Sequence, residues 1–212
     1  MVFLNPYENE ELKIRKSGTT TLGIICKDGV VVAAEKKSTL GYLVASKETE
    51  KIIPIADHIV LTTAGASGDA QTLARYMKAE IKLFEIQHQR RIPVKASATL
   101  LANILQSSKL SPYWVQLIVA GFDKEEGPSI YSLDAIGGME KEKKFFSTGS
   151  GSPIALGVLE AEYKEGISVK EAKELAYRAI KSAAERDIAS GGKGVDIAVI
   201  TEKGIEIERK EL

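Results

Sequence analysis

The sequence predicts an α+β fold, a four-layer αββα sandwich in which two antiparallel β-sheets are flanked by helix pairs. The chain runs strands, two helices, strands, two helices, strands. Strands and helices therefore do not alternate one by one, as they do in a doubly wound parallel fold. Each of the four helices carries one apolar stripe. Placing the helices in pairs on the outer faces of two sheets buries all four stripes.

The opening third of the chain is mostly β. Residues 19–27 form a run rich in β-branched side chains, and Asp28-Gly29 is a two-residue turn signal. A hairpin to residues 30–35 follows from that signal. Residues 51–56 and 58–63 are a second pair of short apolar runs around Asp57.

Helical spacing of apolar residues begins at about Asp69. A second helix is expected from Val94 to about residue 107, and Pro93 suits its first turn. Strands return at 115–122 and 129–133, with a turn at 124–127 between them. Gly137-Gly138 marks another turn, and 143–147 reads as a short strand. The stripe of the first helix consists of Ala70, Leu73, Ala74, Met77, Ile81 and Phe84.

The last third repeats the pattern of a helix pair and then strands. Residues 150–163 are helix-like, and Ser168 with Glu171 forms a capping box that begins the next helix. We expect Gly191-Gly192 to end that helix and strands to follow at 195–201 and 205–207. The stripe of this last helix consists of Ala172, Leu175, Ala176, Ala179, Ile180 and Ala183.

Composition excludes several classes of protein. The 212 residues include 29 Lys plus Arg and 29 Asp plus Glu, so the balanced charge predicts no nucleic-acid partner and no membrane partner. The single cysteine, Cys26, excludes a disulfide framework and fits a reducing cytoplasm. The chain contains no run of 18 apolar residues that would span a membrane.

Taken singly, the candidate functional residues favour ordinary interpretations. Cys26, His58 and His88 match no metal-ligand spacing, so no metal site is expected. The loop 149–153 has the glycines of a phosphate-binding turn but lacks the Lys-Ser/Thr of a P-loop. Asp187 stands at a helix C-terminus, where the macrodipole disfavours an acid, and therefore suggests a specific partner.

Five motifs, taken in order, resemble the archaeal type of proteasome β subunit. The resemblance runs from Thr19 to about Thr201, and the α subunits of the same particle, which carry an N-terminal helix in place of the Gly-Thr junction, resemble the chain less. The motifs are GTTTLGI followed by CKDGVVVAAE (18–35), Lys51-Ile52, TTAG with GDAQ (62–71), STGSGSP (147–153) and ERDIASGG (185–192).

The resemblance implies the fold of N-terminal nucleophile (Ntn) hydrolases and a threonine peptidase made as a zymogen. Residues 1–18 alone read as a frayed end or as a removable segment, and they are too polar for a signal peptide. The resemblance makes them a propeptide and makes 19–212 a single catalytic domain. Autocatalytic cleavage between Gly18 and Thr19 would free the α-amine of Thr19. That amine, with a pKa of about 8, would serve as the base for the Thr19 hydroxyl.

The resemblance also assigns roles around Thr19. Lys51 would lower the pKa of the Thr19 amine, and Glu35, where most members have Asp, would pair with Lys51. Lys37 stands where Arg is frequent and would support the loop. The backbone N–H of Gly65 would stabilise the oxyanion. The group that orients the amine and a catalytic water would consist of Ser150, Asp187 and Ser190.

The substrate-binding positions implied by the resemblance are small and uncharged, apart from one large aliphatic side chain. Thr39 would bind the peptide backbone. Such a pocket does not favour a charged substrate residue before the cleaved bond, and the sequence does not identify the preferred residue. The specificity pocket would be lined by Ser38, Thr49, Ile53, Thr63 and Ser67.

The implied particle has 28 subunits, with seven-membered β rings stacked between α rings. A separate ATP-driven ring would unfold the polypeptide substrates, and no cofactor is expected in this chain. The main alternative is an unprocessed, structural β subunit of the same particle. A phosphate-binding domain fits less well, because it would need a strand–loop–helix unit in a parallel sheet, which the element order does not predict. The six-fold bacterial threonine protease also fits less well, because its chains have a much shorter leader.

Overall fold

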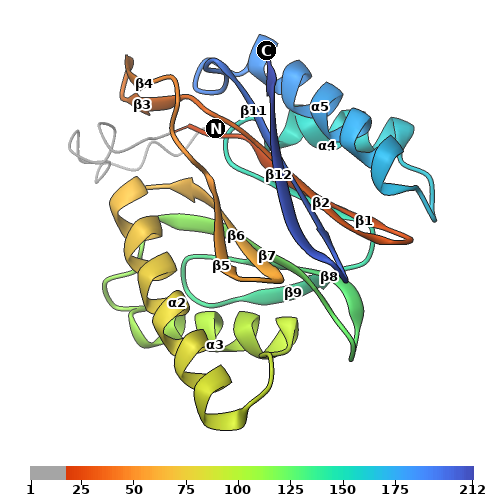
Figure 1. Ribbon diagram of the computed structural model, residues 1–212. Helices are drawn as coiled ribbons and strands as arrows, with labels where there is room; N and C mark the ends of the chain where they lie inside the picture. Colours follow the sequence, from red (N-terminus) through yellow and green to blue (C-terminus); the bar gives the residue numbers. More distant parts are fainter. Residues whose placement is uncertain (1–17) are drawn as a thin grey trace, which may run out of the picture.

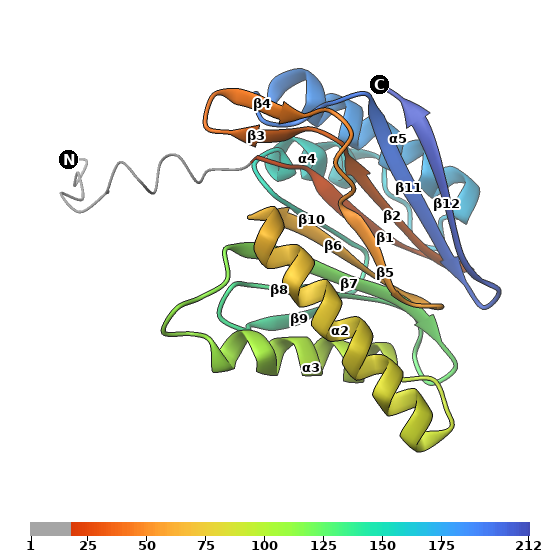
Figure 2. The same ribbon diagram turned by 60° about the vertical axis from the view of Figure 1, so that its left-hand side comes forward.

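The computed structural model describes residues 18–212, in which two five-stranded antiparallel sheets pack face to face (Figure 1). The first sheet has the strand order β10-β1-β2-β11-β12, and the second has the order β5-β6-β7-β8-β9. Strands β3 and β4 form a separate two-stranded hairpin. A helix pair covers the outer face of each sheet (Figure 2). The predicted four-layer αββα sandwich is therefore confirmed.

The first sheet forms around the hairpin that Asp28-Gly29 predicts. Cys26 lies opposite Gly29, and the antiparallel ladder continues to Thr21 opposite Ala34. The next neighbour of the second strand comes from the far end of the chain, since Val195 lies opposite Glu35. The strands of this sheet are β1 (Thr21–Cys26), β2 (Gly29–Glu35), β10 (Phe145–Thr148), β11 (Gly194–Thr201) and β12 (Gly204–Glu211).

The second sheet is a meander in which each strand pairs with the next along the chain. Its strands are β5 (Ile52–Ala56), β6 (Ile59–Gly65), β7 (Val115–Asp123), β8 (Gly127–Leu133) and β9 (Met139–Glu142). The separate hairpin consists of β3 (Ser38–Leu40) and β4 (Leu43–Ser46). It follows β2 and precedes β5, so it connects the two sheets.

The helices pack through the stripes that the sequence predicts. The pair α2 (Ser67–His88) and α3 (Val94–Ser107) covers the second sheet, and α4 (Ser152–Glu162) with α5 (Val169–Arg186) covers the first. The capping box at the start of α5 is present, with both of its hydrogen bonds. All six predicted stripe residues of α5 are buried. Of the α2 stripe, only Phe84 is partly exposed. None of the helices in 18–212 is both long and apolar enough to cross a membrane.

Several elements differ from the sequence-based expectation. Strands β3, β4 and β9 are not predicted, because each has only three or four residues and lacks an apolar alternation. Helix α5 ends at Arg186, since the backbone turns extended at Asp187, well before Gly191. Pro93 is the N-cap of α3 and does not lie inside its first turn. Strand β12 continues to Glu211, because β11 offers it an eight-residue ladder.

Candidate active site

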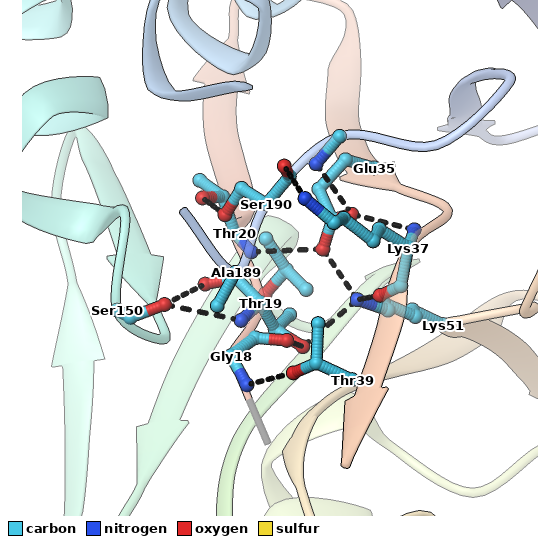
Figure 3. Close-up of polar contacts among 12 residues, drawn as sticks. Gly18, Thr19, Thr20, Glu35, Lys37, Thr39, Lys51, Ser150, Ala189 and Ser190 are labelled. Carbon is cyan, nitrogen blue, oxygen red and sulfur yellow. Dashed lines mark hydrogen bonds and ion pairs between the residues drawn. The ribbon is translucent and has the colours of Figure 1, made fainter. Parts of the chain in front are cut away.

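The site lies where β1 begins, β2 ends and the chain enters β5. Thr19 is buried two residues before β1. Its Oγ1 donates a hydrogen bond to the Gly18 carbonyl oxygen at 2.6 Å and accepts one from Lys51 Nζ at 2.8 Å. Figure 3 shows Thr19 between the side chains of Lys51 and Ser150. The hydroxyl therefore touches a backbone carbonyl on one side and a cation on the other.

Lys51 immediately precedes β5 and is buried. Its ammonium has three acceptors, which use all of its donors: Thr19 Oγ1, the Lys37 carbonyl at 2.6 Å and the Glu35 carboxylate. Burial lowers the pKa of Lys51, and the Glu35 charge opposes that fall. The three acceptors fix the direction in which the ammonium points, which is toward the hydroxyl of Thr19.

Glu35, the last residue of β2, is completely buried, and both of its carboxylate oxygens are hydrogen-bonded. Oε1 accepts from the Thr20 N–H at 3.2 Å as well as from Lys51, and Oε2 accepts from the N–H groups of Lys37 at 2.7 Å and Gly191 at 3.0 Å. Burial raises the pKa of Glu35, and the Lys51 charge opposes the rise. Three backbone donors and one cation give a buried carboxylate the partners that it requires.

The backbone nitrogen of Thr19 meets a second polar group. It donates to Ser150 Oγ at 3.2 Å, and Ser150 Oγ donates to Asp187 Oδ2 at 2.6 Å. Ser190 Oγ donates to the same carboxylate oxygen at 2.5 Å. Asp187 caps the C-terminus of α5, so these two hydroxyl donors, with the Ala189 N–H on Oδ1 at 3.3 Å, compensate for the unfavourable helix dipole.

The loop that carries Ser150 lies tightly against Thr19. Gly149 has φ of +91°, and a Cβ added there would lie 2.1 Å from the Thr19 carbonyl oxygen. Its N–H is held by Gln116 Oε1 at 3.0 Å. Only glycine fits this left-handed conformation and this close approach. The loop therefore serves the site by contact with Thr19, with no phosphate-binding role required.

A small cavity opens beside Thr19 and Lys51. Residues from β3, the segment that leads into β5, β5, β6 with Gly65 and the start of α2 line it, so the structure brings together all five positions expected for the specificity pocket. Thr39 is not in the lining; its Oγ1 accepts from the Gly18 N–H at 3.3 Å. The lining consists of Thr19, Ser38, Thr49, Glu50, Lys51, Ile53, Thr63, Gly65, Ser67, Ala70 and Gln71.

Sequence reasoning missed two residues of the site. Thr20 donates its N–H to Glu35, and its Oγ1 lies 2.6 Å from Ser190 Oγ; the GTTTLGI motif contains it, but the sequence assigns it no role. Gly191 donates to Glu35, a contact that neither its place in the ERDIASGG motif nor its expected role as a helix end predicts. Lys37 supports the loop as expected, because its Nζ donates to the carbonyls of Ile188 at 2.7 Å and Ser190 at 3.3 Å.

The three residues considered for a metal site, Cys26, His58 and His88, lie outside this cluster, and His88 is the last residue of α2. Cys26 is buried in the core, where burial raises its pKa to about 12, and His58 Nε2 is bonded to the Ile92 carbonyl at 2.8 Å. Within 18–212, no three His, Cys, Asp or Glu side chains gather in a way that would hold a metal ion. The chemistry open to the described site is that of a hydroxyl nucleophile beside a buried ammonium.

Comparison with known proteins agrees with this geometry. The family model for proteasome subunits matches residues 15–200. The chain is 54% identical over 196 residues to a proteasome subunit beta of Archaeoglobus profundus, covering 92% of this chain and 90% of the relative. It is 51% identical over 194 residues to one of Methanocaldococcus jannaschii, covering 92% and 86%. The chain therefore belongs to the proteasome subunit family, as a β-type subunit and threonine endopeptidase of the Ntn-hydrolase class that assembles with α subunits into the core particle.

Proposed function

We propose that residues 1–18 are a propeptide and that Thr19, freed by autocatalytic cleavage, is the nucleophile that cleaves unfolded polypeptides. The observation that carries this proposal is the position of Thr19 Oγ1, 2.6 Å from the Gly18 carbonyl oxygen and 2.8 Å from Lys51 Nζ. Residues 1–17 lie outside the described part of the chain, so the proposal rests on the junction itself.

Cleavage of the junction would proceed through an acyl shift. The Thr19 oxygen attacks the Gly18 carbonyl carbon, and its proton passes to a base. The tetrahedral adduct collapses by breaking the bond from that carbon to the Thr19 nitrogen, which takes up a proton. Water then hydrolyses the Gly18 ester, releasing the leader as a carboxylate and leaving a free α-amine on Thr19.

Peptide hydrolysis would repeat the same steps on a substrate carbonyl. The α-amine takes the proton of the Thr19 hydroxyl, since its ordinary pKa of about 8 is close to neutral pH. Lys51 lowers the pKa of that amine through like-charge repulsion, and Glu35 holds Lys51 in place. Ser150, Asp187 and Ser190 orient the amine and the water that hydrolyses the acyl ester.

The substrate would lie between β3 and the end of β6. Thr39, which already accepts a hydrogen bond from the Gly18 N–H, would bind the peptide backbone. The Gly65 N–H would stabilise the oxyanion and lower the activation barrier by about 3–4 kcal/mol. Ser38, Thr49, Ile53, Thr63 and Ser67 would receive the side chain before the cleaved bond. Because only Ile53 is large and aliphatic, small or apolar residues suit the pocket better than charged ones.

The assembled particle would be cytoplasmic. It would have seven-membered β rings stacked between α rings, 28 subunits in all, with a separate ATP-driven ring supplying unfolded substrates. Because the stacked rings would enclose the active sites, only polypeptides that have been unfolded could enter and reach Thr19. No cofactor enters this scheme, since the nucleophile, base and oxyanion donor all come from the polypeptide.

The intact mass of this chain after co-assembly with α subunits tests the proposal. Loss of residues 1–18 in assembled particles supports it, because the new N-terminus is then Thr19. The full mass in an assembled particle, with no peptide hydrolysis, contradicts it and identifies the alternative, an unprocessed structural β subunit.

A further inference from the structure

Lys36 is a buried charge that the mechanism does not use. Its side chain is 0% exposed and is among the largest fully buried side chains of the described chain. It lies between two residues that hold the Lys51 ammonium: Glu35 does so with its carboxylate and Lys37 with its carbonyl. A buried ammonium requires a compensating partner.

The partner of Lys36 is Asp196, near the start of β11. Lys36 Nζ donates to Asp196 Oδ2, and the other carboxylate oxygen accepts from Arg209 Nε at 3.0 Å. Asp196 lies opposite Ala34 on β2 and opposite Arg209 on β12, and the three strands are neighbours in the first sheet (Figure 1). The carboxylate therefore anchors the end of β2 from the adjacent strand.

The backbone of Lys36 is held on both sides as well. Its N–H donates to the Gly191 carbonyl at 2.9 Å, and its carbonyl accepts from the Thr49 N–H at 2.9 Å. Gly191 is also a donor to Glu35, and Thr49 lines the specificity pocket. A shift of Lys36 would thus displace two of the three acceptors of Lys51 together with one wall of the pocket.

An apolar pair of similar volume is often as stable as a buried ion pair, so stability alone does not account for Lys36 and Asp196. We propose that the Lys36–Asp196 ion pair, extended by Arg209, is a positioning element. It fixes the backbone of residues 35–37 so that Glu35 and Lys37 direct the Lys51 ammonium at Thr19. This inference rests on the proposed function of Lys51 and Thr19 and assigns Lys36 no contact with substrate.

Three variants of the full chain, co-assembled with α subunits, test the inference. In Lys36→Met and in the double variant Lys36→Met/Asp196→Leu, kcat for a short peptide should fall about tenfold or more while KM stays within about twofold. The double variant leaves no unpaired buried charge, so it keeps the test valid if the single variant folds poorly. Lys36→Arg keeps the ion pair and should restore most of kcat.

Lys193→Met is the matched control, because it removes an exposed ion pair with Glu48; its kcat should match that of the unmodified chain. Hydrogen exchange gives a readout that needs no activity. The backbone amides of residues 37–49 and Gly191 should exchange faster in the double variant and not in the control. An unchanged kcat and unchanged exchange in the double variant would overturn the inference. If the unmodified particle is itself inactive, the proposed function fails, and exchange alone decides the role of Lys36.

Discussion

Lys51 and Thr19 are 32 positions apart in the chain, yet the Lys51 ammonium donates directly to the Thr19 hydroxyl at 2.8 Å. The contact joins the two sheets, since Thr19 precedes β1 of the first sheet and Lys51 precedes β5 of the second. It places a buried cation on the proposed nucleophile while Gly18 is still joined to Thr19. Under the proposed function, the proposed precursor would therefore already have the arrangement that the mature site needs.

Replacing Thr19 with alanine should reduce peptide hydrolysis to background, a loss of at least about 10³-fold, because the nucleophile is gone. The same variant should keep residues 1–18, as measured by intact mass. Thr19→Ser retains a hydroxyl and should retain processing. Thr72→Ala is the control, because the half-buried hydroxyl that it removes has both of its hydrogen bonds, to Gly68 and from Arg75, within α2. Normal turnover by Thr19→Ala would rule out the mechanism.

Removing the Lys51 charge should cost about 10²–10⁴-fold in peptide hydrolysis while the particle still assembles. Lys51→Ala leaves the buried Glu35 carboxylate without its cation, which also threatens stability. The neutral double variant Lys51→Met/Glu35→Gln avoids that penalty and should be equally inactive. Peptide assays beside gel filtration separate the two effects, with the exposed Lys109→Ala as control. An active double variant would mean that the ammonium is dispensable.

The pH profile should report on the Glu35–Lys51 pair. Burial places the pKa of Lys51 below its ordinary 10.5, and the Glu35 charge partly restores it. Activity should therefore be lost on the basic side at a pH below 10.5, as the ammonium loses its proton. Glu35→Gln removes the restoring charge, so the pKa of Lys51 falls further and the basic limb moves to lower pH. A limb that stays in place or moves upward in this variant would contradict the assignment of that limb to Lys51.

A side chain at Gly18 should slow removal of the proposed leader. A Cβ there would lie 1.8 Å from Ala189 Cβ and 2.9 Å from Ser150 Oγ. We expect Gly18→Ala to slow cleavage by about 10²-fold, because the carbonyl moves away from Thr19 Oγ1. Intact mass against time measures the rate.

Two further variants show whether the effect is steric. Gly18→Ala/Ala189→Gly removes the closest contact and should recover part of the cleavage rate. Gly157→Ala adds a Cβ on α4 that meets no atom of another element within 4 Å, and should leave cleavage unchanged while stabilising the helix by about 1 kcal/mol. Cleavage of Gly18→Ala at the normal rate would show that the junction can relax around a methyl group.

Most of the fold could be predicted because its signals are local. The stripe of α5 and its capping box lie within one stretch of sequence, and the Asp28-Gly29 turn joins two adjacent runs. The short strands β3, β4 and β9 are not predicted, because each has only three or four residues and no apolar alternation. The end of α5 was placed too late because the Gly191-Gly192 pair outweighed Asp187, whose extended backbone ends the helix.

The sequence by itself determined the residue types of the site and, through the resemblance, their order: Gly18-Thr19, Glu35, Lys51, Gly65, Ser150, Asp187 and Ser190. Only the tertiary structure decided which of them touch. Ser150 reaches the Thr19 nitrogen across 131 positions and Gly191 reaches Glu35 across 156. No periodicity spans such separations, since these contacts form when two sheets and their helix layers pack. For the same reason, Lys36 and Asp196, 160 positions apart, read as unrelated charges until the first sheet brings β2 beside β11.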